Sequence, residues 1–232
     1  MAKRTVCAAF LAFLLLALNA SIPAAPTEDA VRVKRLAIVT GSPNSEPENK
    51  AADILKTRIL KRSSVTVQVA QEDAPDLQEV ISQAEAVFVL GIPGGAGFAS
   101  RVMHDHGVRL PALPGSDKIH PESFAVKTKI VEGPKALICV AGADERGMLY
   151  GVGYVLRAVT CLSDALLLPR IDAQDKPAFP LRGGRPTGPG SRARQFGNLR
   201  PQTPGEMTEV MEDLMLLGCN IFEGEPASIR AY

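Results

Sequence analysis

The sequence predicts an α/β (α+β) fold, a mixed β-sheet with helices mainly on one face, and three observations support this prediction. Strand-like and helix-like segments alternate from residue 35 to residue 90. Two strand-like segments then follow each other between residues 123 and 141. Beyond a stretch rich in proline and glycine at residues 175–204, a helix and a strand begin the pattern again.

The alternating part begins with a short apolar strand at Arg35 to Thr40. Residues 45–59 then combine capping-box spacing with apolar residues at helical spacing, which predicts a helix. Val65 to Ala70 alternates as a half-buried strand does. A short helix is expected at residues 77–84, and Ala86 to Leu90 is apolar throughout, as in a strand buried on both faces.

The next two strands interrupt this alternation. Ser123 to Ile130 and Lys135 to Ala141 are separated only by a short segment around Glu132-Gly133, which is typical of a hairpin. Because the strands of a hairpin run antiparallel, a mixed sheet fits the pattern better than a purely parallel one.

The clearest helix in the sequence follows Asp144, a good N-cap residue. Its apolar residues recur on one face: Met148, Leu149, Val152, Val155, Leu156 and Val159. Three glycines, Gly147, Gly151 and Gly153, each lower helix propensity by up to ~1 kcal/mol relative to Ala. We expect close packing against the sheet to be the reason for these glycines.

A second unit is expected beyond the Pro/Gly/Arg stretch. Thr203, Pro204 and Glu206 again have the spacing of a capping box, with proline at the first helical position. Gly218 can end this helix before the strand-like Cys219 to Phe222. The helix carries an apolar stripe of Met207, Val210, Met211, Leu214 and Leu217. Helix and strand need partners to cover them, so we expect one full domain and part of a second.

The N-terminus predicts export. Lys3 and Arg4 precede an apolar run from Val6 to Leu18, and small residues follow, as in a secretory signal peptide at residues 1–25. The run is shorter than the roughly 20 residues that span a bilayer. We therefore expect a secreted or periplasmic product with no membrane association after signal cleavage.

Charge and composition argue against several kinds of partner. Loss of Lys3 and Arg4 with the signal peptide leaves 24 of the 26 basic residues against 25 acidic ones, so no nucleic-acid partner is expected. His104, Asp105 and His106 could suggest metal binding, but an exposed helix end is the preferred interpretation. No metal and no cofactor are expected. The three cysteines beyond the signal peptide are expected to be buried and unpaired.

A glycine-rich loop offers one alternative. Gly91 to Gly97 follows a strand and precedes an expected helix, where a nucleotide phosphate could bind. It lacks the dinucleotide fingerprint spacing and the lysine of a P-loop, so a tight turn is preferred over a nucleotide-binding protein.

Three segments carry a resemblance to a known family. Residues 142–151 (GADERGMLYG) fit the pattern G-x-D-x-R-G-x-x-Y-G, residues 121–124 (PESF) precede a strand, and residues 175–183 (DKPAFPLRG) fit D-x-P-x-F-x-x-R-G. Together they resemble the N-terminal domain of exo-acting glycoside hydrolases, namely β-N-acetylhexosaminidases, α-glucuronidases and their relatives, and its link into the catalytic barrel.

The resemblance implies a domain organisation. Residues 31–172 would form a hexosaminidase-like or α-glucuronidase-like N-terminal domain, and residues 173–232 would be the first strand–helix–strand of a truncated (β/α) TIM barrel. In the hexosaminidases the arginine of the R-G element binds substrate hydroxyls, and Arg182 matches that position, with a linker-surface role as the alternative. Glu223 and Glu225 follow a strand end where barrels carry their sites, and they are further candidates for sugar binding beside the alternative of a solvated loop.

The resulting expectation is a non-catalytic N-terminal domain of a secreted glycoside hydrolase that acts in carbohydrate metabolism. The family hydrolyses O-glycosyl bonds, but its catalytic carboxylates lie on later strands, so no catalytic residue is expected here. The partner implied is a poly- or oligosaccharide if a full barrel were present. The alternative is an extracellular carbohydrate-binding or interaction module without enzymatic activity.

Overall fold

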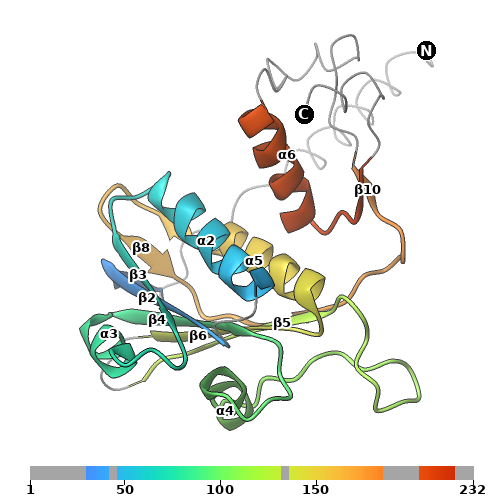
Figure 1. The fold of residues 1–232 in the computed structure, drawn as a ribbon, viewed down its shortest axis with the longest axis horizontal. Coiled ribbons are helices and arrows are strands. Elements are labelled where there is room, and N and C mark those ends of the chain that lie inside the picture. Colours follow the sequence, from blue (N-terminus) through green and yellow to red (C-terminus); the bar gives the residue numbers. More distant parts are fainter. Residues whose placement is uncertain (1–29, 42–45, 132–135, 185–203, 223–232) are drawn as a thin grey trace, which may run out of the picture.

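The computed structural model describes residues 30–41, 46–131, 136–184 and 204–222 (Figure 1). At its centre lies a six-stranded sheet in the order β3-β2-β4-β6-β5-β9. The first four strands of this order are parallel, and β5 and β9 run antiparallel to their neighbours. The mixed sheet is thus confirmed. Its strands are β2 (Arg35–Thr40), β3 (Thr66–Gln71), β4 (Ala86–Gly91), β5 (Phe124–Lys129), β6 (Ala136–Gly142) and β9 (Asp172–Asp175).

Helices cover both faces of the sheet, with the two longer ones on the same face. There, α2 (Glu46–Leu60) and α5 (Glu145–Ala158) lie side by side and bury residues such as Ile54 and Val152 against Phe88 (Figure 1). On the other face the shorter helices α3 (Leu77–Gln83) and α4 (Phe98–Asp105) pack on alternate strand residues. Strand β4 is therefore buried along its whole length, as its unbroken apolar run predicts.

A small antiparallel sheet extends the core beside the long helices. It has the order β1-β8-β7, formed by β1 (Val31–Val33), β8 (Leu166–Leu168) and β7 (Thr160–Cys161). Val33, Leu166 and Leu168 join the core cluster of α2 and α5. All three cysteines in the described part of the chain are unpaired, as expected, but only Cys139 is fully buried, and Cys161 and Cys219 are half-buried.

Helix α5 begins as its sequence predicts. The carboxylate of Asp144 accepts a hydrogen bond from the backbone N–H of Gly147 at 2.9 Å, which caps the helix. Gly151 lies against the sheet as expected, because an added Cβ would come within 2.8 Å of Val140. Gly153 has a different reason, since a Cβ there would lie 2.0 Å from the carbonyl oxygen of Leu216 on the last helix.

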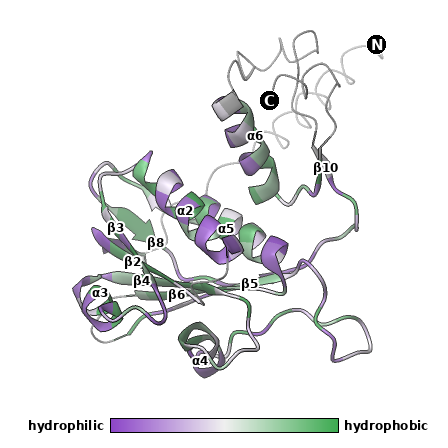
Figure 2. Cartoon of the chain, in the orientation of Figure 1, coloured by the Kyte–Doolittle hydropathy of each residue, from purple (hydrophilic) through white to green (hydrophobic). Residues whose placement is uncertain are grey.

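That last helix belongs to a strand–helix–strand unit at the end of the described chain. Strand β10 (Gly183–Gly184) pairs in parallel with β11 (Ile221–Phe222), and α6 (Pro204–Leu216) lies between them in sequence. Figure 2 shows apolar segments on α6 as well as in the sheet. Among the described helices, none is long and apolar enough to cross a bilayer.

Candidate functional site

Arg182, just before β10, is the centre of a hydrogen-bond cluster between the α/β domain and the last unit. Its Nε donates to the carbonyl oxygen of Gly218 and its Nη1 to that of Phe179, both at 2.6 Å. Its Nη2 donates to the Tyr150 hydroxyl at 2.9 Å and to a carboxylate oxygen of Glu122. The guanidinium carbon also lies 5.3 Å from the centre of the Tyr150 ring, within cation–π range.

Glu122 supplies the carboxylate of this cluster, and its backbone adopts a conformation that favours glycine. Its φ of 57° is the one positive value among the described non-glycine residues. Its backbone N–H donates to the Asp144 carboxylate at 2.8 Å. Its own carboxylate accepts from Arg182, from Arg146 at 2.8 Å and from the Asn220 amide at 3.4 Å. These bonds on backbone and side chain hold the conformation in place.

The charges in this cluster compensate each other. Burial raises the pKa of the Glu122 carboxyl, but the hydrogen bonds from Arg182, Arg146 and Asn220 outweigh burial and hold the pKa below its usual range. Burial lowers the pKa of Arg182, and its bonds to Glu122 and Tyr150 more than reverse this effect. Burial is also the main reason why the pKa of Tyr150 is raised. Glu122 is therefore ionised at neutral pH and is not available as a proton donor.

Asn220 ties β11 to the same cluster. Its side-chain oxygen accepts from the Arg182 backbone N–H at 2.9 Å, and its side-chain nitrogen donates to the carbonyl oxygen of Pro180 at 2.8 Å. Its backbone N–H donates to the Arg182 carbonyl oxygen at 2.9 Å. We call this group, made of Glu122, Arg146, Tyr150, Arg182 and Asn220, the Glu122–Arg182 junction.

Of the three predicted site residues, Arg182, Glu223 and Glu225, the structure describes only Arg182. Arg182 lies in the junction, where four of its five N–H donors already have protein acceptors, and its role in substrate binding stays a prediction. Glu223 and Glu225 lie outside the described residues. Sequence reasoning did not single out Glu122 or Tyr150 individually, although both fall inside the segments that carry the family resemblance.

The glycine-rich loop is arranged differently from a phosphate site. The backbone N–H of Ala99, in the first turn of α4, donates to the Glu72 carboxylate at 3.1 Å. The N–H of Ile92 donates to the Glu48 carboxylate at 3.3 Å. Burial, with a smaller contribution from nearby Glu72, raises the pKa of Glu48, which is 7% exposed. A phosphate at this loop would meet two acidic side chains, which already accept hydrogen bonds from two of the N–H groups there.

The histidine pair lies at the end of α4. The His104 side chain is 90% exposed and its ring contacts the neighbouring Asp105 carboxylate at 3.3 Å. Burial is the main cause that lowers the pKa of His106. No group of three metal-binding side chains comes together in the part of the chain that the structure describes.

Comparisons with known proteins complete the description. No protein-family model and no curated protein matches this chain. Three solved structures that do match are glycoside hydrolases. A family 20 β-N-acetylglucosaminidase is 19% identical with a TM-score of 0.35, over 71% of this chain and 24% of that one. A mutant Streptomyces plicatus β-hexosaminidase in complex with product GlcNAc is 13% identical with a TM-score of 0.39, over 67% and 25%.

The third solved structure is a Flavobacterium johnsoniae chitobiase. It is 16% identical with a TM-score of 0.40, over 69% of this chain and 20% of that one. The chain thus spans a quarter or less of the length of each of these neighbours.

Proposed function

We propose that residues 31–172 are the non-catalytic N-terminal domain of a secreted glycoside hydrolase of the hexosaminidase or α-glucuronidase type. Residues 173–232 would begin its catalytic (β/α) barrel, and residues 1–25 would be removed as a signal peptide. One observation carries the proposal: the three segments that resemble this family meet in the Glu122–Arg182 junction. Glu122 comes from the first segment, Tyr150 from the second and Arg182 from the third.

The unit around α6 supports the same proposal. A parallel pair of strands joined through a helix is how a (β/α) barrel begins, and β10, α6 and β11 have this arrangement. Helix α6 contacts α2 with charged residues, and its apolar stripe is left partly uncovered, with Met211 36% and Leu217 64% exposed. Further barrel elements would cover this stripe, in keeping with a domain that continues.

The junction is suited to holding two domains together and not to cleaving a glycosidic bond. Glycosidases use a pair of carboxyl groups, one of which donates a proton. At the junction the carboxylate of Glu122 is ionised and accepts from two arginines. We therefore assign glycosidic cleavage to other parts of the whole enzyme, and a poly- or oligosaccharide would be its substrate.

Two experiments test this function. The purified chain is expected to release no aglycone from aryl hexosaminides or aryl glucuronides, and release would overturn the proposal. In the gene, the codons after Tyr232 are expected to continue in frame into strands that end in paired Asp or Glu residues. An immediate stop codon would contradict the proposal and favour an extracellular carbohydrate-binding or interaction module.

A further inference from the structure

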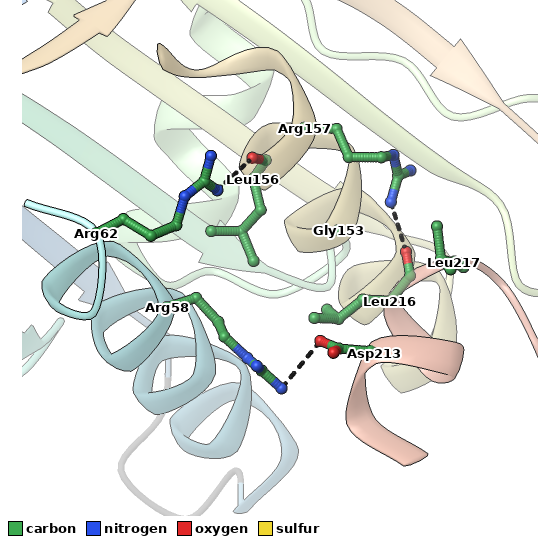
Figure 3. A pocket seen from close by; sticks show the side chains of 8 residues that line it. All are labelled: Arg58, Arg62, Gly153, Leu156, Arg157, Asp213, Leu216 and Leu217. Atoms are coloured by element: carbon green, nitrogen blue, oxygen red, sulfur yellow. Dashed lines mark hydrogen bonds and ion pairs between the residues drawn. The ribbon is translucent and has the colours of Figure 1, made fainter. Parts of the chain in front are cut away.

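A pocket of about 430 Å³ lies between α2, α5 and α6 and shares no lining residue with the Glu122–Arg182 junction. Its volume is within the range of roughly 300–1,000 Å³ that is common for small-molecule sites. Figure 3 shows three arginines around it, Arg58 and Arg62 from α2 and its C-terminal turn and Arg157 from α5.

Arg58 is fully neutralised by α6. Its side chain is 13% exposed and forms ion pairs with Glu209 at 2.6 Å, Asp213 at 3.0 Å and Glu212 at 3.4 Å. These contacts position α6 and line one side of the pocket. Arg58 therefore has no excess positive charge to offer a ligand.

The other two arginines are in a different situation. Arg62 donates to the carbonyl oxygen of Leu156 at 3.3 Å, and Arg157 donates to that of Leu216 at 2.9 Å (Figure 3). Neither forms an ion pair with any carboxylate among the described residues. Both side chains are exposed, and burial lowers the pKa of Arg157, an effect that nearby Tyr154 only partly offsets. Each guanidinium has five N–H donors, so both retain donors for a further acceptor.

Apart from the three arginines and Asp213, which pairs with Arg58, the pocket is lined by leucines and Gly153. Leu156 and Leu216 are 8% and 6% exposed, and Leu217, at 64%, forms an open edge. Gly153 lets α6 approach α5 closely, because any Cβ would collide with the Leu216 carbonyl oxygen. Apolar side chains thus lie next to two guanidinium groups that lack an anionic partner.

We propose that this pocket binds a small organic anion. Its carboxylate or phosphate group would be held by Arg62 and Arg157, and its apolar body would lie on Leu156, Leu216 and Leu217. Guanidinium groups match both oxyanions because their planar fork donates two parallel hydrogen bonds. The proposed glycosidase role uses neither arginine, although Leu217 also belongs to the apolar stripe of α6 that further barrel elements would cover.

Calorimetric titration at constant ionic strength tests the proposal with three probes of similar body: benzoate, phenyl phosphate and the neutral benzyl alcohol. At least one anion is expected to bind, and benzyl alcohol is expected to bind at least tenfold more weakly, since charge-assisted hydrogen bonds contribute about tenfold each. The stronger of the two anions identifies the oxyanion. Absence of binding by both anions, or equal binding of the alcohol, would overturn the proposal.

Variants locate the site. Arg62→Gln is expected to weaken the bound anion about tenfold, and Arg62→Lys is expected to fall between it and the wild type because the charge stays and the fork is lost. Arg157→Gln also removes a contact to α6, so Arg62 is the decisive position. Arg170→Gln removes the same charge from an exposed position that does not line the pocket, and its affinity is expected to match the wild type. Equal affinity of the Arg62→Gln and Arg170→Gln proteins would place the anion elsewhere.

Discussion

Among the described residues, the carboxylates of Glu122 and Glu48 are both largely removed from water, and their surroundings shift the pKa of each in opposite directions. Glu122 accepts hydrogen bonds from two arginines and has a lowered pKa. Glu48 is buried beside Glu72, one of its oxygens has no hydrogen-bond partner among the described residues, and burial raises its pKa. Stability should therefore depend on pH in opposite ways at these two residues.

Replacing Glu122 by Gln removes the charge that pairs with Arg182 and Arg146. The variant is expected to be less stable than the wild type by about 2 kcal/mol at pH 7, the scale of a few charge-assisted hydrogen bonds. Because the pKa of Glu122 is lower in the folded state, its contribution is present above the ordinary value of 4.5 and is lost as pH falls through the folded value. Urea denaturation at pH 7 and pH 3 measures this difference.

The matched control for this experiment is Glu145→Gln. Glu145 is exposed in the first turn of α5, so its change is expected to stay within about 0.5 kcal/mol. An equal loss in both variants would show that general charge, and not the junction, stabilises the fold.

At Glu48 the pH dependence of stability has the opposite sign. Its folded pKa is raised, so the stability it contributes is present below 4.5 and is lost as pH rises through the folded value. Glu48→Gln keeps an acceptor for the Ile92 N–H and is expected to be more stable at pH 7 by about 1 kcal/mol, with no gain at pH 4. Thermal unfolding at both pH values checks this. Glu46 is exposed at the start of the same helix, so the stability of Glu46→Gln should equal that of the wild type. A gain in stability of Glu48→Gln that is confined to pH 4 would contradict this prediction.

At the scale of elements, sequence patterns were most informative where the cause is local. The Asp144 cap, the buried run of β4 and the helix before Gly218 depend on residues close in sequence, and the structure has all three. The small sheet of β1, β7 and β8 has no clear sequence signal, because its strands have three residues or fewer and β1 pairs with β8 across more than 100 positions. The Gly153 contact was misjudged for the same reason, because its partner, α6, is far along the chain.

Helix α6 docks through a close backbone contact and ion pairs, which makes its position sensitive to Gly153. Gly153→Ala is expected to displace α6 and destabilise its docking by about 1–3 kcal/mol, since the Leu216 carbonyl cannot move independently of the helix. Cleavage by a Glu-specific protease within α6 should accelerate. In Gly95→Ala, where the nearest atom would lie 3.7 Å from the new Cβ, cleavage should be unchanged, and equal rates in the two variants would contradict this contact.

At the scale of the whole molecule, the mixed sheet followed from the sequence and its strand order did not. The hairpin-like pair of strands predicts antiparallel pairing at one side. The positions of β3 and β9 at the sheet edges depend on long-range contacts with no local signal. In the same way Arg182 was recognised as a candidate, while its partner Glu122, 60 positions away, emerged only from the fold.

The Glu122–Arg182 junction joins the α/β domain to the unit of β10, α6 and β11. Hydrogen exchange of the wild type and of Arg182→Gln tests it most directly. We expect slow exchange of α6 in the wild type, and at least tenfold faster exchange of α6 and β11 in the variant, with β2, β4 and β6 unchanged. Identical exchange of α6 in the two proteins, or free exchange already in the wild type, would contradict it.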